Sequence, residues 1–169
     1  TMNFDGSTSK DGIRGRLNGR AQELAFNDAQ YSNIDIEGMV INKSFSGSIT
    51  GHDTPLRFDL DGLADLNGAN PIFDLKLDVA EADLHAMNIN QRDSLSLLSF
   101  RSELYAVGRT LDDLTGSLTI DGGHYIYDAD TLQTSQIRLA ANNDSAQRSL
   151  TLTSDFADAT FTGPTSYAD

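Results

Sequence analysis

Apolar and polar residues alternate with a period of two over most of this chain. In residues 56–61 and 73–79, Leu, Phe and Val occupy one set of alternate positions, and Asp, Lys and Arg occupy the other. Successive side chains of a β-strand point to opposite faces, whereas a helical face repeats every 3.6 residues. The alternation therefore predicts an all-β protein in which each strand has one apolar and one polar face.

A short phrase, apolar-x-Gly-x-apolar-x-Gly, recurs along the chain. It occupies residues 13–19 and 45–51, and a looser copy occupies residues 114–120. Glycine inside a strand marks a bend or a close approach of neighbouring backbones. Repetition of such a phrase predicts a β-repeat architecture, in which function lies in an extended surface rather than in a compact cluster of side chains.

Turn signals divide the chain into about 10–12 strands, which gives either an elongated curled sheet, groove-like or taco-like, or a β-sandwich. A change in the parity of the apolar positions predicts a bulge near Gln22. Residues 82–98 lose the alternation, so we expect a short helix or a loop there. The expected turns lie at residues 42–43, 67–71, 121–123 and 142–144.

The chain is expected to hold one domain. Residues 1–11 are rich in Gly, Ser, Thr and Lys and predict a loose lead-in. Residues 12–163 form the single β-repeat domain, which we interpret as a fragment of a longer protein with neighbouring β-repeats of the same chain as partners. Residues 164–169 form a tail.

Composition excludes several classes of partner. The 25 acidic and 12 basic residues give a formal net charge of −13, whereas nucleic-acid binding needs a basic surface. The absence of cysteine excludes disulfides and thiolate metal sites. No apolar run approaches 18 residues, so no membrane span is expected in this fragment.

The sequence offers no constellation of reactive side chains. His52, His85 and His124 lack His or Glu partners at metal-ligand spacing. The acidic stretch 59–68 lacks the residue order of an EF-hand and fits solvent-facing strand positions. Phosphate-binding glycine loops and a nucleophile elbow are also absent. We therefore expect no catalytic residue, no metal site, no cofactor and no enzymatic activity.

The apolar strand faces need a cover, because a sheet with one apolar face must keep that face from water. A second sheet would make these faces an ordinary core. A curled sheet would instead leave a groove that lipid chains can fill, and the residues alone do not decide between the two. The candidate groove residues are Leu56, Phe58, Leu60, Phe73, Leu75, Leu77, Val79, Leu104, Leu118, Ile120, Leu150 and Leu152.

The order and spacing of several segments resemble a known family. They are residues 56–66, 71–79, 82–89, 93–96, 108–116, 127–132 and 154–156. Together they resemble an internal stretch of a TamB-type protein, in the wider AsmA-like group of bacterial envelope proteins, as found in Bacteroidetes-like bacteria. The resemblance covers residues 12–163.

This resemblance implies a location and a function. TamB-type proteins, which belong to a translocation and assembly module, are anchored in the inner membrane and cross the periplasm. Their β-taco body is associated with outer-membrane biogenesis, protein secretion and lipid transport. The resemblance thus implies a periplasmic segment that shields or conducts phospholipid along an apolar groove, with an outer-membrane assembly protein as a further partner. It carries no catalytic residue to this chain.

The sequence is also compatible with two alternatives. The segment could be a structural spacer or an interaction module that binds outer-membrane protein strands by pairing along its sheet edges. It could also be a carbohydrate-binding or hydrolytic β-domain, although the absence of Trp disfavours sugar stacking.

Overall fold

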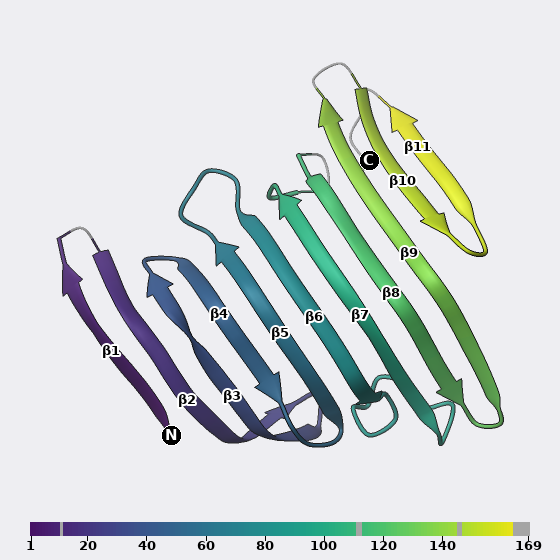
Figure 1. The fold of residues 1–169 in the computed structure, drawn as a ribbon, viewed down its shortest axis with the longest axis horizontal. Coiled ribbons are helices and arrows are strands. Elements are labelled where there is room, and N and C mark those ends of the chain that lie inside the picture. Colours follow the sequence, from purple (N-terminus) through teal and green to yellow (C-terminus); the bar gives the residue numbers. More distant parts are fainter. Residues whose placement is uncertain (11, 111–112, 145–146, 164–169) are drawn as a thin grey trace.

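The chain folds into one antiparallel sheet of eleven strands (Figure 1). The structure, a computed structural model, describes residues 1–10, 12–110, 113–144 and 147–163, and it contains no helix within them. The strands are β1 (Met2–Ser9), β2 (Gly12–Phe26), β3 (Ala29–Ile41), β4 (Ser44–Gly51), β5 (Leu56–Asp65), β6 (Ile72–Asp83), β7 (Ser96–Val107), β8 (Thr115–Tyr127), β9 (Asp130–Asp144), β10 (Gln147–Ser154) and β11 (Asp158–Gly163).

Each strand pairs only with its neighbours in the sequence, so the sheet is a meander. It stays open, because β1 and β11 lie at opposite ends and do not pair with each other. The all-β prediction and its strand number are confirmed. Of the two predicted architectures, the described residues form the curled open sheet, and the sandwich is wrong because they contain no second sheet.

Register follows the alternation of the sequence. Leu60 on β5 lies opposite Ile49 on β4 and Leu77 on β6. The adjacent residue Asp59 lies opposite Thr50 and Asp78. A slip of one residue would turn each strand's apolar set to the other face, so the pattern fixes the register. The result is a mainly apolar face and a mainly polar face, although register also places Met39 and Leu63 on the polar face.

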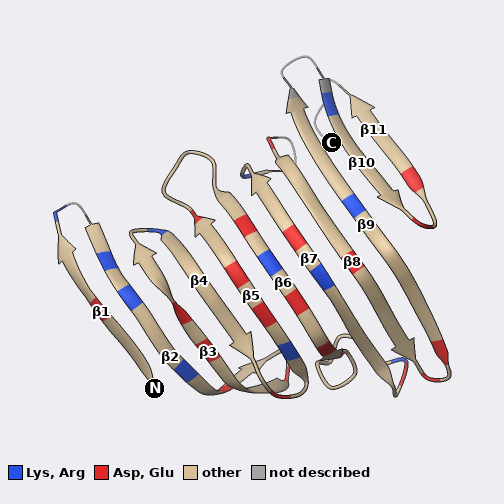
Figure 2. Ribbon diagram, viewed as in Figure 1, with Lys and Arg blue, Asp and Glu red and all other residues tan. Residues whose placement is uncertain are grey.

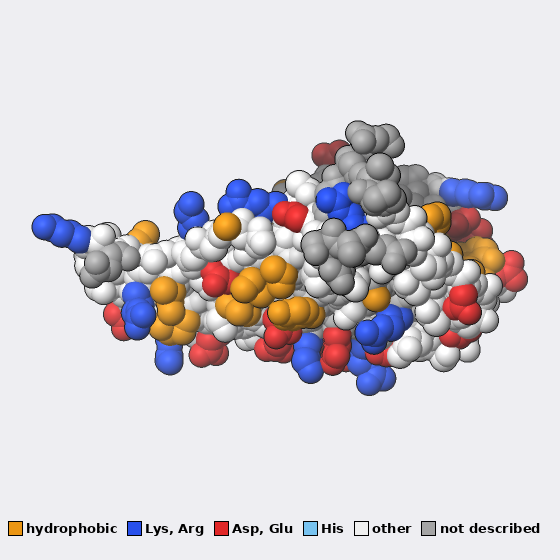
Figure 3. All heavy atoms as spheres, turned by 90° about the horizontal axis from the view of Figure 1, so that it is seen from above, with side chains coloured by type: hydrophobic (Ala, Val, Ile, Leu, Met, Phe, Trp, Pro, Cys, Tyr) orange, Lys and Arg blue, Asp and Glu red, His pale blue; other side chains and the backbone are white. Residues whose placement is uncertain are grey.

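The charged residues lie mainly on the polar face. Figure 2 shows acidic and basic positions side by side along the middle of β5, β6 and β7. In the space-filling view of Figure 3, side chains of both signs project from one broad side of the elongated molecule. Ion pairs join neighbouring strands there, with Lys76 3.1 Å from Glu103 and Arg57 3.2 Å from Glu81.

Two of the predicted turns are confirmed. Asn42 and Lys43 connect β3 to β4, and Asn42 has the left-handed φ of 56° that asparagine tolerates. Residues 66–71 connect β5 to β6, where the side-chain oxygen of Asn67 accepts a hydrogen bond of 3.1 Å from the backbone nitrogen of Lys43. This bond ties the β3–β4 turn to the β5–β6 connection at the same edge of the sheet.

Two other turn predictions were wrong. Residues 121–123 lie inside β8, where Gly122 has φ 60° and is an extra residue opposite a register shift in β7. A bulge needs the same left-handed glycine that a turn needs, which explains the error. Residues 142–144 end β9 rather than forming the turn itself.

The expected loose lead-in was also wrong. Residues 2–9 form β1, which pairs with β2 along its full length. Its small residues suit this strand because the Phe4 ring packs over Gly6 and Gly15. A Cβ on Gly15 would lie 2.4 Å from Cζ of that ring. The predicted tail, residues 164–169, lies outside the described residues.

Residues 84–95 connect β6 to β7 as a loop of turns, so the loop prediction is confirmed and the short helix is wrong. The carbonyl of Leu84 accepts hydrogen bonds from the nitrogens of both Ile89 and Asn90, which closes a turn instead of continuing a helix. The loop is fixed to the sheet by polar contacts. The side-chain nitrogen of Asn90 donates to Tyr125 Oη at 2.9 Å and to Oγ of the fully buried Ser96 at 3.1 Å.

Candidate functional site: an apolar crease across the open sheet

All twelve predicted groove residues lie on the apolar face. Register connects them in rows across the strands, such as Leu75, Leu104 and Leu118, with Leu152 two strands further on. A second row contains Phe73 on β6 and Leu150 on β10. The structure therefore brings the predicted set together on one surface.

This surface is uncovered. The chain exposes 10950 Å² to solvent, whereas a compact globular protein of 18.3 kDa exposes about 8,100 Å². The apolar residues that reach full burial among those described are small: Ala29, Val79, Ala82 and Ala106. A sandwich of this size would bury Leu, Ile and Phe side chains, so the apolar face is a surface and not a core.

A line of backbone irregularities crosses the sheet near one end of the strands, and we call it the crease. It follows the paired row Ile34, Gly51, Phe58, Val79 and Phe100, from β3 to β7. Register shifts occur beside Phe58, after Val79 and beside Phe100. Because bulges bend a strand and increase its twist, a row of them bends the whole sheet toward one face.

The crease continues to both flanks of this row. In the β2–β3 hairpin, Asn33 has φ 50° and lies opposite Gln22. These two residues do not pair, although the residues on both sides of them do. The parity change expected near Gln22 is therefore present, but the register is not shifted as a bulge would require. The strand bends because Asn33 has a left-handed backbone conformation, and no extra residue is inserted. On the other flank, the crease passes through Gly122 of β8.

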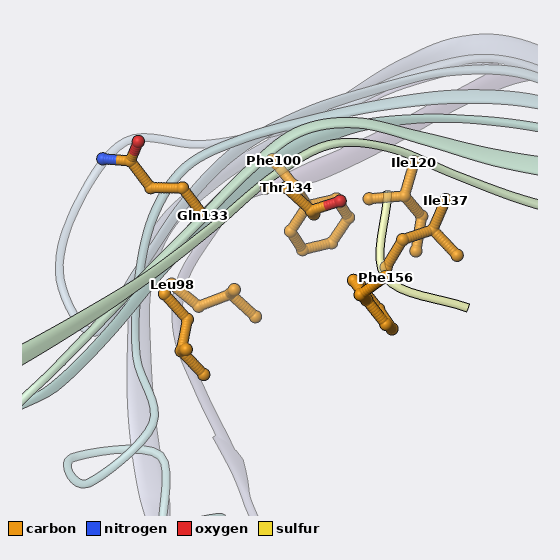
Figure 4. A pocket seen from close by; sticks show the side chains of 9 residues that line it. Leu98, Phe100, Ile120, Gln133, Thr134, Ile137 and Phe156 are labelled. Atoms are coloured by element: carbon orange, nitrogen blue, oxygen red, sulfur yellow. The ribbon is translucent and has the colours of Figure 1, made fainter. Parts of the chain in front are cut away.

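The first hollow lies inside the crease on β7, β8 and β9, with a volume of about 520 Å³. Its lining residues are Leu98, Phe100, Ile120, Gly123, Leu132, Gln133, Thr134, Ile137 and Phe156. Figure 4 shows the strands arching over Phe100, Ile120 and Ile137, while Phe156 from the β10–β11 turn faces them. Leu132 and Phe156 remain 59% and 71% exposed, so the hollow opens to solvent.

The second hollow, of about 310 Å³, lies at the other end of the crease. The β2–β3 hairpin bends across the ends of β4 and β5 to form it (Figure 1). Asn27 at the hairpin tip donates from its side chain to the carbonyl of Met87 at 3.0 Å, and Asn88 returns a bond of 3.0 Å to the carbonyl of Asn27. Its lining residues are Leu24, Phe26, Asn27, Tyr31, Ile34, Leu56, Phe58, Met87 and Ile89.

An aspartate holds the crease at each flank. Asp53, in the β4–β5 turn, accepts hydrogen bonds from the side chains of Asn33 and Ser32, which lower its pKa in that order. Asp155, in the β10–β11 turn, accepts from the backbone nitrogen and the hydroxyl of Ser135, and these bonds lower its pKa. Both carboxylates are therefore ionised at neutral pH, and each fixes a strand where it bends.

The polar face beside the second hollow carries a charged cluster. Arg20 on β2 binds Asp35 on β3 through two hydrogen bonds of 2.6 Å. His52 Nε2 lies 2.9 Å from Oδ2 of the same carboxylate, the oxygen that also accepts from Arg20 Nη2. The hydrogen bond from Arg20, followed by that from His52, lowers the pKa of Asp35 to about 2. The cluster ties β2, β3 and the β4–β5 turn together.

The histidines and acidic residues do not converge on a reactive centre in the described residues. His52 contacts Asp35, whereas His124 sits on β8 opposite Ser99 and Gln133. Nδ1 of His85 is buried and has no hydrogen-bond partner. Across the described ranges, no group of three or more His, Asp or Glu side chains could hold a metal ion. No described helix is long and apolar enough to cross a membrane.

Sequence reasoning missed part of the crease. The missing residues include Leu24, Phe26, Tyr31, Leu98, Leu132 and Phe156. Leu24 and Phe26 occupy even positions, whereas the apolar-face residues at the start of β2 occupy odd positions. The bend at Asn33 in the paired strand brings both side chains to the apolar side. Ile34, Ile36 and Ile49 also lie on this face and could have been found from their alternation alone.

Comparison of the chain with protein families, with curated proteins and with solved structures gave no match.

Proposed function

We propose that this chain is a non-enzymatic segment of a periplasmic protein that bridges the inner and outer membranes. It shields or conducts phospholipid along the apolar crease and thereby supports assembly of the outer membrane. One observation carries the proposal: the apolar face of the sheet is continuous, curled and uncovered. The resemblance to TamB-type proteins supplies the location and the neighbouring β-repeats as partners.

The energetics favour an apolar occupant of the crease. Phe26, Ile89, Leu132 and Phe156 line the two hollows and are each more than half exposed. Apolar surface costs about 25 cal/mol for each Å² left in water. Large exposed apolar patches on a protein surface mark binding sites for apolar partners. Acyl chains fit this site because they need no hydrogen bonds from a lining that offers few.

Native mass spectrometry of the purified chain, followed by organic extraction, tests the proposal. We expect co-purifying phospholipid that is lost when Leu132→Asp and Phe156→Asp are combined. Both side chains are exposed, so the double variant should keep its fold. Thr119→Asp is the matched control, because Thr119 lies on the polar face opposite Arg138. A lipid-free mass for the folded wild type would contradict the proposal.

A second candidate function, binding of extended strands, is favoured by one observation. β9 continues through residues 130–136 beyond the last residue that pairs with β10, Ile137. No described strand pairs with this part of β9 on the β10 side, and the first hollow lies beside it. The Asp155 side chain already binds the backbone nitrogens of Ser135 and Gln136, so the free edge consists of residues 130–134. A free edge next to an apolar pocket is the arrangement used for strand addition. Binding of a labelled peptide with alternating apolar residues, without any lipid, would favour this function.

A further inference from the structure

The crease offers no positive charge to a ligand. None of the residues that line its two hollows is charged. Arg20, near the second hollow, already binds Asp35 through two hydrogen bonds. Arg148 lies on the apolar side of β10, but six residues from Ser154, which is about 20 Å along a strand. An anionic headgroup beside the first hollow would therefore find no cation among the residues that line it.

A fixed negative charge stands at the rim instead. Asp155 precedes Phe156, whose ring lines the first hollow. Asp155 and His124 line an adjoining hollow that shares Gly123, Gln133 and Thr134 with the first one. Hydrogen bonds to Ser135 and Gln136 hold the Asp155 side chain in place. The net charge of −13 adds a repulsive background for anions.

We propose that the first hollow selects phospholipids by headgroup charge, taking zwitterionic lipids that carry an ammonium group in preference to anionic ones. The acyl chain lies along the crease, and the ammonium group lies at the β10–β11 turn beside Asp155. This inference rests on the lipid-binding function proposed above. It adds the substrate class and names the residue that sets the class.

A competition experiment tests the selection. The chain is incubated with vesicles of equal parts phosphatidylcholine and phosphatidylglycerol and re-isolated, and its bound lipid is quantified by mass spectrometry. We expect phosphatidylcholine to be enriched about five-fold at low salt. An enrichment of this size corresponds to the attraction between two opposite unit charges about 4 Å apart in water. The enrichment should fall toward unity at 1 M salt, where the screening length is about 3 Å.

The outcomes separate the inference from its premise. Equal uptake of both lipids overturns the selection and leaves the lipid-binding function standing. Preference for phosphatidylglycerol also overturns the selection. If the folded chain binds neither lipid, the lipid-binding function is contradicted, and the selection fails with it.

Variants at the rim locate the effect. Asp155→Asn should lower the preference for phosphatidylcholine, and Gln133→Lys, which adds a cation at an exposed rim position, should reverse it. Asp59→Asn removes the same charge from the polar face and is the matched control. Equal changes in Asp155→Asn and Asp59→Asn would show that net charge alone acts and would overturn the assignment to Asp155. Thermal melting confirms that each variant is folded.

Discussion

Gly47 should be intolerant of even one methyl group. It lies on β4 between Gly38 of β3 and Gly62 of β5. A Cβ built on Gly47 would lie 2.1 Å from the carbonyl oxygen of Glu37 and 2.4 Å from Cα of Gly38. These are backbone atoms within a paired ladder, so relief of the clash requires movement of whole strands. The φ of Gly47 is not positive, so the effect is one of space alone.

Two opposing terms set the size of the effect. Overpacking of a tight site costs about 1–3 kcal/mol. Alanine in a strand recovers about 0.5–1 kcal/mol relative to glycine because it loses less conformational freedom on folding. We expect Gly47→Ala to lower the free energy of unfolding by about 1–2 kcal/mol. Urea denaturation measures this change, and the slope m should stay the same.

Gly68→Ala is the matched control. Gly68 lies in the β5–β6 connection, its φ is not positive, and the nearest atom to its added Cβ would be Asn70 O at 3.4 Å. We expect its stability to stay within about 0.5 kcal/mol of the wild type. If Gly47→Ala were as stable as the wild type, or if both variants lost equal stability, the close approach of β3, β4 and β5 would not explain the glycine.

Three further predictions concern the crease and its supports. Asp35 should titrate near pH 2 by NMR. Because its pKa is lowered on folding, ionised Asp35 stabilises the fold above pH 3.8, and this stabilisation is lost as the pH falls toward 2. Arg20→Gln should raise the midpoint of the Asp35 titration. An unchanged titration midpoint would contradict the ion pair. Asn33→Gly should be more stable than Asn33→Ala by about 1 kcal/mol in urea, because only the left-handed φ distinguishes these variants; equal stabilities would contradict a strained bend. Tyr125→Phe should cost about 1–3 kcal/mol, because it leaves the buried Ser96 hydroxyl with one partner fewer; a neutral result in thermal melts would show that the hydroxyl contact does not stabilise the loop.

The regular strands could be predicted from the sequence because their two faces differ in polarity. In β5 and β6, Leu60 and Leu77 face one side while Asp59 and Asp78 face the other, and pairing in register brings like with like. The prediction of β1 failed because Gly6 and Ser7 have low strand propensity when considered alone. Pairing with β2 and the Phe4 ring over two glycines stabilises this strand, and neither contact is local in sequence.

The candidate groove face was predictable for the same reason, but the crease was not. A crease depends on irregularities that fall in one row only after the strands have paired, such as those beside Phe58 and Phe100. Gly122 shows the difficulty, because Asp-Gly-Gly is equally typical of a turn and of a bulge. Phe156 continues the alternation of Leu150 and Leu152 in the sequence, but β10 ends at Ser154 and Phe156 lies in the following turn, so its position at the hollow depends on that turn.

Photo-crosslinking tests the central claim, that the uncovered crease holds phospholipid, most directly. A photoreactive amino acid is placed at position 132, inside the first hollow, and at position 119 on the polar face, and each protein is irradiated in cells. Mass spectrometry of the purified proteins should find phospholipid adducts at position 132 and none at position 119. Adducts at both positions in equal yield, or protein adducts alone at position 132, would contradict the account.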